Sequence, residues 1–486
     1  MTVITEELKT RAEQIKNEAN VLFKDKKFPA AIEKYTEAIQ VNPNVASYYT
    51  NRAFCHLKLE SYGYAIADSD KALEVDPNFT KANYRRASAN MALGDFKAAL
   101  KDLRVVSKRA PSDKDAKSKF DECAKIVRRI EFEKAIEHDE VRRSVADSIE
   151  VDAITVESSY NGPKINEDTK KVDLDFIKGM VNRFKDEKMI HRKYAFMIVL
   201  AIREYMLEAP SLIDVKVPSD GKLTVCGDVH GQFYDFINIF ETNGYPSEKH
   251  AYLFNGDFVD RGSFSVEVIL TLFAYKLLYP NQVFLARGNH ETDNMNKVYG
   301  FEGEVKAKFS DMMFKLFSET FNALPLSHVI ENKIFVTHGG LFSRDGVTLD
   351  EIRKIDRITQ GQPGSDGLMC ELLWSDPQPE MGRVPNKRGV GIQFGPDVTK
   401  NFLETNGLDM IIRSHEVKEE GYVIEHDGKC VTVFSAPNYC DTVGNKGALI
   451  NITPDMKLDY VTFSAVPHPS VRPMQYASQF SGLLGM

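Results

Sequence analysis

Two patterns of hydrophobic and polar positions divide the chain. Over the first third, small and aromatic residues recur every 34 positions, a period that predicts pairs of antiparallel helices. From Leu223 onward, apolar runs of four or five residues rich in β-formers repeatedly end in polar turns, as buried strands do. We therefore expect a multi-domain protein in which an all-α array precedes an α/β domain.

Four series of positions carry the 34-residue period. Pro43, Pro77 and Pro111 would each close the second helix of a unit, and small residues fall where paired helices approach closely. The other series are Ala19, Ala53 and Ala87; Ala31, Ala65 and Ala99; and Phe28, Tyr62 and Phe96. The pattern resembles the tetratricopeptide repeat, in three copies.

The repeats would form a domain over residues 1–144. The three copies span about residues 12–45, 46–79 and 80–113, and a charged extension helix follows a capping-box-like sequence that begins at Ser112.

The rest of the chain divides by composition. Residues 145–171 are polar, contain turn residues and show little periodicity, which predicts an inter-domain linker. As a flexible tether it would let the repeat domain sit over the second domain or swing away. We expect the second domain over residues 172–470 and a C-terminal tail over residues 471–486.

Stacked repeats present a concave surface to a ligand. Five side chains on the first helices of successive units match the carboxylate-clamp pattern of repeat domains that bind acidic chaperone tails: Lys16, Asn20, Asn51, Lys81 and Arg85. Their cations and amides would hold carboxylates by charge-assisted hydrogen bonds. The resemblance implies heat-shock protein 90, and also heat-shock protein 70, as partners. The alternative is a solvated helix face, which composition alone favours.

Five strand-like runs, LTVC, AYLFN, QVFLA, KIFVT and MIIRS, lead into turns that hold candidate metal ligands. These ligands are Asp228, His230, Asp257, Asn289, His338 and His415. Loops at one edge of a sheet are where open sheets bind ligands, and Asp, His and Asn suit a divalent metal of intermediate softness. A lone Gly-Asp pair is usually a turn and a single buried His a core residue, but here the motifs occur together and in order.

The simplest allocation of these ligands gives two metal ions. Asp228 and His230 would hold one ion, and Asp257 would bridge the two. The other ion would be held by Asn289, His338 and His415. Such a pair stabilises both oxygens of an in-line phosphoryl displacement, and the expected nucleophile is a metal-bound hydroxide. The ligands suit Mn²⁺ or Mg²⁺, and Fe or Zn fit them as well.

The motifs of this region resemble those of the metal-dependent serine/threonine phosphoprotein phosphatases. They are GDVHG, GDFVDRG, RGNHE, HGG, LLWSDP and SAPNYC. The resemblance covers roughly residues 12–475 and agrees with the six ligands above. It implies a metallophosphoesterase domain with a central β-sandwich flanked by helices, which would hydrolyse phosphoserine and phosphothreonine in protein substrates.

The resemblance also implies roles for residues around the metals. His290 matches the general acid that protonates the leaving seryl or threonyl oxygen, and Asp260 would orient and tune it. The residues that match phosphate ligands are Arg261, Asn289, Arg388 and Tyr439. Arg413, beside a ligand histidine, is expected to support its loop instead.

Regulation is implied as well. In the family, the repeat domain and the C-terminal tail cover the catalytic channel, and Glu60 falls at the position that contacts it. A carboxylate there could compete with phosphate for Arg261 and Arg388, and a chaperone tail in the clamp would then activate the enzyme. The alternative for Glu60 is a solvated loop residue.

Composition and charge exclude other classes. The longest strongly apolar stretch, Tyr194 to Ile202, is far shorter than the ~20 residues that span a bilayer. Residues 1–150 carry 27 Lys and Arg against 25 Asp and Glu, and the remainder 35 against 45, so no nucleic-acid partner is expected. Six cysteines without a CxxC pair suit a reducing compartment. We expect a cytoplasmic monomer, with nuclear entry left open.

Two other functions fit parts of the sequence. A catalytically inert chaperone adaptor would need only the repeats, but every predicted ligand and the acid are present. A two-metal phosphodiesterase could use the same scaffold, but LLWSDP and SAPNYC favour the phosphoprotein phosphatases.

Overall fold

The computed structural model describes residues 5–137 and 144–477. They form two compact units, a repeat unit mainly within residues 1–142, with which residues 386–389 are grouped, and a sandwich unit within residues 143–385 and 390–478. No helix in the described ranges is both long and apolar enough to cross a membrane.

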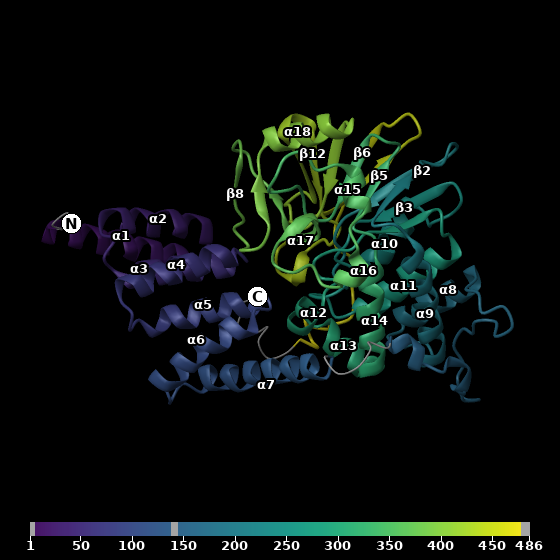
Figure 1. Cartoon of the computed structure of the whole chain (residues 1–486), viewed down its shortest axis with the longest axis horizontal. Coiled ribbons are helices and arrows are strands. Elements are labelled where there is room, and N and C mark those ends of the chain that lie inside the picture. Colours follow the sequence, from purple (N-terminus) through teal and green to yellow (C-terminus); the bar gives the residue numbers. More distant parts are fainter. Residues whose placement is uncertain (1–4, 138–143, 478–486) are drawn as a thin grey trace. The chain divides into compact units, whose positions relative to one another are not determined.

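The repeat unit consists of three helix hairpins followed by a longer helix (Figure 1). Its helices are α1 (Glu6–Lys24), α2 (Phe28–Val41), α3 (Ala46–Lys58), α4 (Tyr62–Val75), α5 (Thr80–Ala92), α6 (Phe96–Arg109) and α7 (Lys114–Glu137). All six alanines of the two periodic series are fully buried, as close packing of paired helices requires. The predicted tetratricopeptide array is confirmed. The expected continuation of α7 towards Ser144 falls on residues 138–143, outside the described residues.

A partly buried Arg–Asp pair recurs at the same spacing and joins the two helices of a hairpin. The Arg52 guanidinium donates to both carboxylate oxygens of Asp68, at 2.8 and 2.6 Å. Arg86, 34 positions later, donates to Asp102 in the same way, at 2.8 and 2.7 Å. Such forked, charge-assisted pairs fix orientation as well as contact, so they hold each hairpin at one angle.

The sandwich unit is built on two mixed sheets and a small third one. The strand orders are β1-β5-β6-β10-β12-β11, β14-β13-β2-β3-β4 and β7-β9-β8. The strands are β1 (Leu212–Val215), β2 (Lys222–Cys226), β3 (His250–Phe254), β4 (Val283–Leu285), β5 (Ser327–Ile330), β6 (Ile334–Thr337), β7 (Asp376–Pro377), β8 (Arg383–Pro385), β9 (Ile392–Phe394), β10 (Met410–Arg413), β11 (Tyr422–Glu425), β12 (Cys430–Val433), β13 (Gly447–Ile452) and β14 (Leu458–Phe463). Each of the five strand-like runs overlaps a strand, namely β2, β3, β4, β6 and β10.

The core lies between the two large sheets, and helices cover their outer faces. Val225 and Leu253 of one sheet share a buried cluster with Val336 and Ile412 of the other. The helices are α8 (Leu174–Lys185), α9 (Arg192–Glu208), α10 (Phe233–Asn243), α11 (Ser265–Leu278), α12 (Asp293–Tyr299), α13 (Phe301–Lys308), α14 (Asp311–Ala323), α15 (Leu349–Arg353), α16 (Arg357–Gln360), α17 (Gly367–Trp374) and α18 (Pro396–Asn406), with short 3-10 turns at η1 (Val145–Ser148), η2 (Val151–Ala153), η3 (His426–Gly428) and η4 (Tyr439–Asp441). The predicted sandwich flanked by helices is confirmed.

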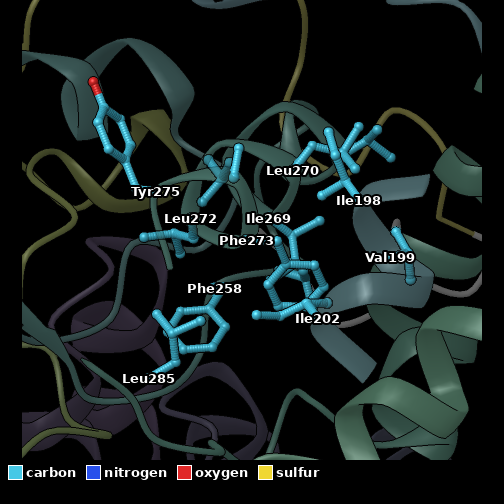
Figure 2. Packing of buried hydrophobic residues seen from close by; sticks show 14 of the residues in the cluster. Ile198, Val199, Ile202, Phe258, Ile269, Leu270, Leu272, Phe273, Tyr275 and Leu285 are labelled. Carbon is cyan, nitrogen blue, oxygen red and sulfur yellow. The ribbon is translucent and has the colours of Figure 1, made fainter. Parts of the chain in front are cut away.

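The loop after β3 is anchored in the helical part of the core. Phe258 and Val259 are fully buried, and Figure 2 shows Phe258 beside Leu285 of β4, near the side chains of α11. Asp257 and Asp260 flank this apolar pair. The core therefore fixes the backbone that carries two of the predicted site residues.

Residues 144–165 lie on the sandwich unit, which corrects the linker predicted over residues 145–171. Val145 N–H donates to Glu319 of α14 at 2.6 Å, and Ile165 is only 2% exposed. Ile149, Val151 and other apolar residues of this stretch pack against the helical part of the core, where η1 contacts α14 and η2 contacts α9. They are scattered singly among polar residues with neither a helical nor a strand period, so their burial could not be predicted from the sequence.

The described part of the predicted tail also lies on the sandwich unit. We call residues 464–477 the C-terminal strap. Met474 N–H donates to Arg261 O at 2.8 Å, and Ser263 Oγ both donates to Arg472 O at 2.7 Å and accepts from Gln475 N–H at 3.0 Å. The strap thus holds the loop that contains Arg261. Residues 478–486 lie outside the described residues.

Candidate active site

The predicted ligands follow the carboxyl ends of parallel strands in both large sheets. β2, β3 and β4 run parallel and lead to Asp228, Asp257 and Asn289. β6 and β10 run parallel in the other sheet and lead to His338 and His415. The loops therefore meet at one edge of the sandwich.

Asp257 lies between two groups of ligands. Its Oδ2 is 3.5 Å from His230 Nε2 and 3.3 Å from His338 Nε2. Beside His230 is Asp228, whose Oδ2 lies 3.7 Å from Nε2 of that histidine. Beside His338 Nε2 are Asn289 Oδ1 at 2.9 Å and His415 Nδ1 at 3.2 Å. All six side chains are buried. The structure thus brings together every predicted ligand, with Asp257 between the two groups.

The donor chemistry fits divalent metal ions. His230 Nδ1 lies 3.0 Å from Val259 O and His338 Nδ1 lies 2.8 Å from Asn255 O, so each ring donates from Nδ1 and turns its Nε2 lone pair towards the carboxylates. Burial lowers the pKa of both histidines, which keeps them in the neutral form that binds metal. Burial also raises the pKa of Asp228 to about 7, and a bound cation would relieve the cost of its ionisation.

Glu291 holds the backbone around Asp257. Its Oε2 accepts from Asp257 N–H and Gly288 N–H, and its Oε1 accepts from Phe258 N–H, each at 2.8 Å. Sequence reasoning assigned Glu291 no role. The sequence signal for a role of Glu291 was its place directly after Asn289 and His290.

His290 and Asp260 form a buried pair beside the ligands. His290 Nδ1 lies 2.8 Å from Asp260 Oδ2, and Phe301 N–H donates to Asp260 Oδ1 at 2.9 Å. Burial raises the pKa of Asp260 to about 7, against the opposing effect of the hydrogen bond from Phe301. The imidazole of His290 packs edge-on against that of His230, with 4.8 Å between ring centroids. The predicted acid therefore adjoins the metal-ligand group.

Three predicted phosphate ligands besides Asn289 have different surroundings. The Arg261 guanidinium lies 3.9 Å from the ring centroid of Tyr299, a residue that sequence reasoning missed because no motif contains it. The Tyr439 ring lies 5.2 Å from that of His230. Arg388 is on the turn between β8 and β9, in a sheet that carries none of the ligands, and its role stays a prediction.

The loops of the site adopt left-handed backbone conformations at residues other than glycine. Of the 18 such residues in the described chain, eight belong to these loops: His230, Asp257, Asp260, Arg261, His415, Asn438, Cys440 and Asp441, with φ between +42° and +71°. This conformation is costly for residues with a Cβ and concentrates at functional sites.

Arg413 supports the loops, as the sequence indicated. Its guanidinium donates to Gly339 O at 2.7 Å, to Asp376 Oδ1 at 2.8 Å and to Glu416 Oε2 at 3.0 Å. Both Arg413 and Asp376 are fully buried. The contact with Gly339 ties this network to the residue that follows His338.

The clamp residues lie on α1, α3 and α5 of the repeat unit. Asn51 Nδ2 lies 3.4 Å from Asn20 Oδ1, so these two predicted positions meet. Lys16 pairs with Glu13 of its own helix. Arg85 lies 3.5 Å above the ring centroid of Phe54, and burial lowers its pKa to about 10, so it remains a cation at neutral pH. Lys81 is exposed on α5.

Glu60 occupies a turn position that recurs in each repeat. Lys26, Glu60 and Gly94 are 34 apart, and all have positive φ, at 58°, 56° and 75°. Glycine favours this backbone conformation, whereas a side chain there is strained. The turn itself therefore gives no reason for a glutamate at position 60.

Known proteins resemble the chain over nearly its whole length. The calcineurin-like phosphoesterase family matches residues 221–419, and the family described as the PPP5 TPR repeat region matches residues 120–214. Serine/threonine-protein phosphatase T of Aspergillus oryzae is 58% identical over 466 residues, which is 96% of this chain and 97% of the relative. Serine/threonine-protein phosphatase 5 of Homo sapiens is 56% identical over 469 residues, which is 96% of this chain and 93% of the relative.

A solved structure agrees with these relatives. It is a protein serine/threonine phosphatase from Saccharomyces cerevisiae, described as similar to human phosphatase PP5. It is 46% identical and superposes with a TM-score of 0.61 over 63% of this chain and 100% of its own. With its helical repeat array, its metallophosphoesterase sandwich and these relatives, this chain belongs to the serine/threonine-protein phosphatase 5/T family.

Proposed function

We propose that this chain hydrolyses phosphoserine and phosphothreonine in proteins at a two-metal centre, under inhibition by its repeat unit and activation by an acidic chaperone tail. The observation that supports the chemistry best is the position of Asp257, whose Oδ2 lies within 3.5 Å of His230 Nε2 and 3.3 Å of His338 Nε2. One carboxylate between two sets of neutral imidazole, carboxylate and amide ligands is the arrangement of a bridged metal pair.

The protein residues would divide the work of the reaction. Asp228 and His230 would hold one ion, and Asn289, His338 and His415 the other. Bound divalent ions, with Mn²⁺ or Mg²⁺ favoured, would polarise the phosphoryl group and ionise an attacking water near neutral pH. Arg261 would donate to the phosphate oxygens, because its planar fork matches them. Arg388 and Tyr439 are proposed as further phosphate ligands.

His290 would supply the proton that the leaving oxygen needs. Its Nδ1 faces Asp260 Oδ2 at 2.8 Å, so that nitrogen is occupied and Nε2 is the atom that can donate to substrate. Asp260 would accept from Nδ1–H and so orient the ring, and a carboxylate beside an imidazole favours the doubly protonated ring that can donate from Nε2.

Metal-dependent phosphate release from a phosphoserine peptide tests the chemistry. We expect activity with Mn²⁺ that is abolished by chelation and falls by roughly 10²–10⁴-fold in His290→Ala, the range of general acid catalysis. A chain that releases no phosphate with Mn²⁺ and an activating acidic peptide would instead be an adaptor. A chain that prefers a phosphodiester would be a phosphodiesterase.

Autoinhibition by the repeat unit is proposed through Glu60. In the family that the chain resembles, the position of Glu60 contacts the catalytic channel, and a carboxylate there could compete with phosphate for the guanidinium groups of Arg261 and Arg388. Glu60→Gln should raise basal phosphatase activity of the full chain. Lys26→Gln, at the equivalent turn of the first repeat, is the matched control and should change nothing. Equal basal rates in both variants and the parent would refute this role.

Activation by chaperone tails is proposed through Lys16, Asn20, Asn51, Lys81 and Arg85. A peptide with the acidic C-terminus of heat-shock protein 90 should bind and raise the rate, because a ligand that prefers the open state shifts the population towards it. The same peptide with an amidated C-terminus is the control, since it lacks the terminal carboxylate. Binding that survives both amidation and Arg85→Ala would contradict the clamp.

A further inference from the structure

One buried amide contacts both members of the His290–Asp260 pair. Asn296, on α12, is 1% exposed. Its Nδ2 donates to Asp260 Oδ2 at 3.0 Å and to the backbone carbonyl of His290 at 2.6 Å. The same oxygen, Asp260 Oδ2, also accepts a hydrogen bond from His290 Nδ1 at 2.8 Å. The contacts therefore form a closed ring from the imidazole through Asp260 and Asn296 back to the His290 backbone.

The orientation of this amide follows from its surroundings. Both atoms that face its nitrogen are acceptors, a carboxylate oxygen and a carbonyl oxygen, so a flipped amide would place oxygen against oxygen. Its own Oδ1 is buried and has no hydrogen-bond partner among the described residues. A buried acceptor without a partner is unfavourable for folding, and such groups call for an explanation. The explanation is that the amide is held in this orientation by the two contacts of Nδ2, with Asp260 Oδ2 and with the His290 carbonyl.

We propose that Asn296 is a positioning residue for proton donation. It acts through His290 and Asp260 and does not touch the substrate. The second oxygen of Asp260 is already fixed by Phe301 N–H at 2.9 Å, so Asn296 completes the restraint of the carboxylate. By also holding the His290 carbonyl, it ties the backbone of the acid to the carboxylate that orients its ring. The inference rests on the proposed function, in which His290 protonates the leaving oxygen.

Substrates with different leaving groups separate positioning from general structural damage. A serine alkoxide needs a proton as it departs, whereas a nitrophenolate leaves without one. Loss of proton donation should therefore slow a phosphoserine peptide much more than p-nitrophenyl phosphate. Misfolding or metal loss would lower both rates by the same factor, because both substrates use the same ligands and are measured on one preparation.

The variants are Asn296→Leu, which has a similar volume but no donor, and Asn296→Ala. We expect kcat for the phosphoserine peptide to fall by about 10–100-fold, part of the range for general acid catalysis, while kcat for p-nitrophenyl phosphate changes less than about threefold. The matched control is Asn451→Leu, which removes another buried amide, on β13, and should leave the ratio of the two rates unchanged.

His290→Ala serves as the reference in the same experiment. If it lowers both rates equally, the assignment of the acid fails and the proposed mechanism is wrong. If it is selective for the phosphoserine peptide but both Asn296 variants lower the two rates equally, or lower neither, the positioning role is refuted.

Discussion

Arg413 and Asp376 form an ion pair from which solvent is excluded, with 2.8 Å between Nη2 and Oδ1 and no exposure of either side chain. Arg413→Met removes the guanidinium that compensates this buried carboxylate. Breaking one side of such a pair destabilises a protein by about 3–5 kcal/mol. That is a large share of the ~5–15 kcal/mol by which domains are stable. We therefore expect Arg413→Met to lower the free energy of unfolding of the sandwich unit by this amount.

The assay can follow the sandwich unit alone. Trp374 is the single tryptophan of the chain and is buried at the end of α17, two residues before Asp376. Its fluorescence during urea unfolding, with Mn²⁺ held constant, reports on this unit and not on the repeats. Arg353→Met is the matched control, because its 3.0 Å pair with Asp214 is partly exposed and worth only about 0.2–1 kcal/mol.

A double variant tests the electrostatic origin of the effect. Replacing both members of a buried pair by uncharged groups is often nearly neutral, so Arg413→Met combined with Asp376→Asn should be more stable than Arg413→Met alone, by roughly 2 kcal/mol. If the double variant is as unstable as the sum of the single ones, the loss comes from packing and loop contacts, and the ion-pair explanation is wrong.

Three other outcomes follow from the structure. Burial lowers the pKa of His328 to about 3, whereas in the unfolded chain the pKa of a histidine is ~6.5. Below pH 6.5 the unfolded chain therefore takes up a proton that the folded chain does not, and the free energy of unfolding should fall by ~2 kcal/mol between pH 6.5 and 5. Urea titrations at several pH values should show a smaller fall in His328→Leu. Chelation should lower the melting temperature, since metal at 1,000 times its Kd adds about 4 kcal/mol to the free energy of unfolding. Differential scanning calorimetry should show a smaller effect of chelation in Asp257→Asn. An equal effect in the variant and the parent would contradict the place of Asp257 as a ligand. Ser263→Ala removes two hydrogen bonds to the C-terminal strap, each worth about 1 kcal/mol. Because this loosens the loop that contains Arg261, KM for a phosphopeptide should rise. An unchanged KM would show that the strap does not affect phosphate binding.

The grouping of the candidate metal ligands could be predicted from sequence because their chemistry and position are both local. Each follows a short apolar strand, and parallel strands bring their carboxyl ends to one edge. Glu291 and Asn296 could not be assigned roles in this way. Their functions depend on which backbone groups lie opposite them in space, Asp257 N–H for one and His290 O for the other, and no sequence period encodes those distances.

The fold was predictable where periodicity is strong and was missed where burial is irregular. The 34-residue series identified the repeats because each alanine lies between paired helices. The segment at residues 144–165 is polar on average, yet Ile165 is buried and Glu319 fixes Val145. Scattered apolar residues in an irregular segment leave no period to detect, so composition alone suggested a free tether.

The left-handed loop residues limit how far this protein can be stabilised. Each costs roughly 1–2 kcal/mol, and glycine would remove that cost at Asp257, Asp260 or Arg261 only by removing the charged group as well. If these residues act as proposed, a more stable protein at these positions would be a less active one. Glu187, which follows α8 with φ of 56°, has the same backbone geometry far from any ligand loop in sequence. Thermostability is therefore best sought at such helix ends, where glycine is the preferred residue and no chemistry is lost.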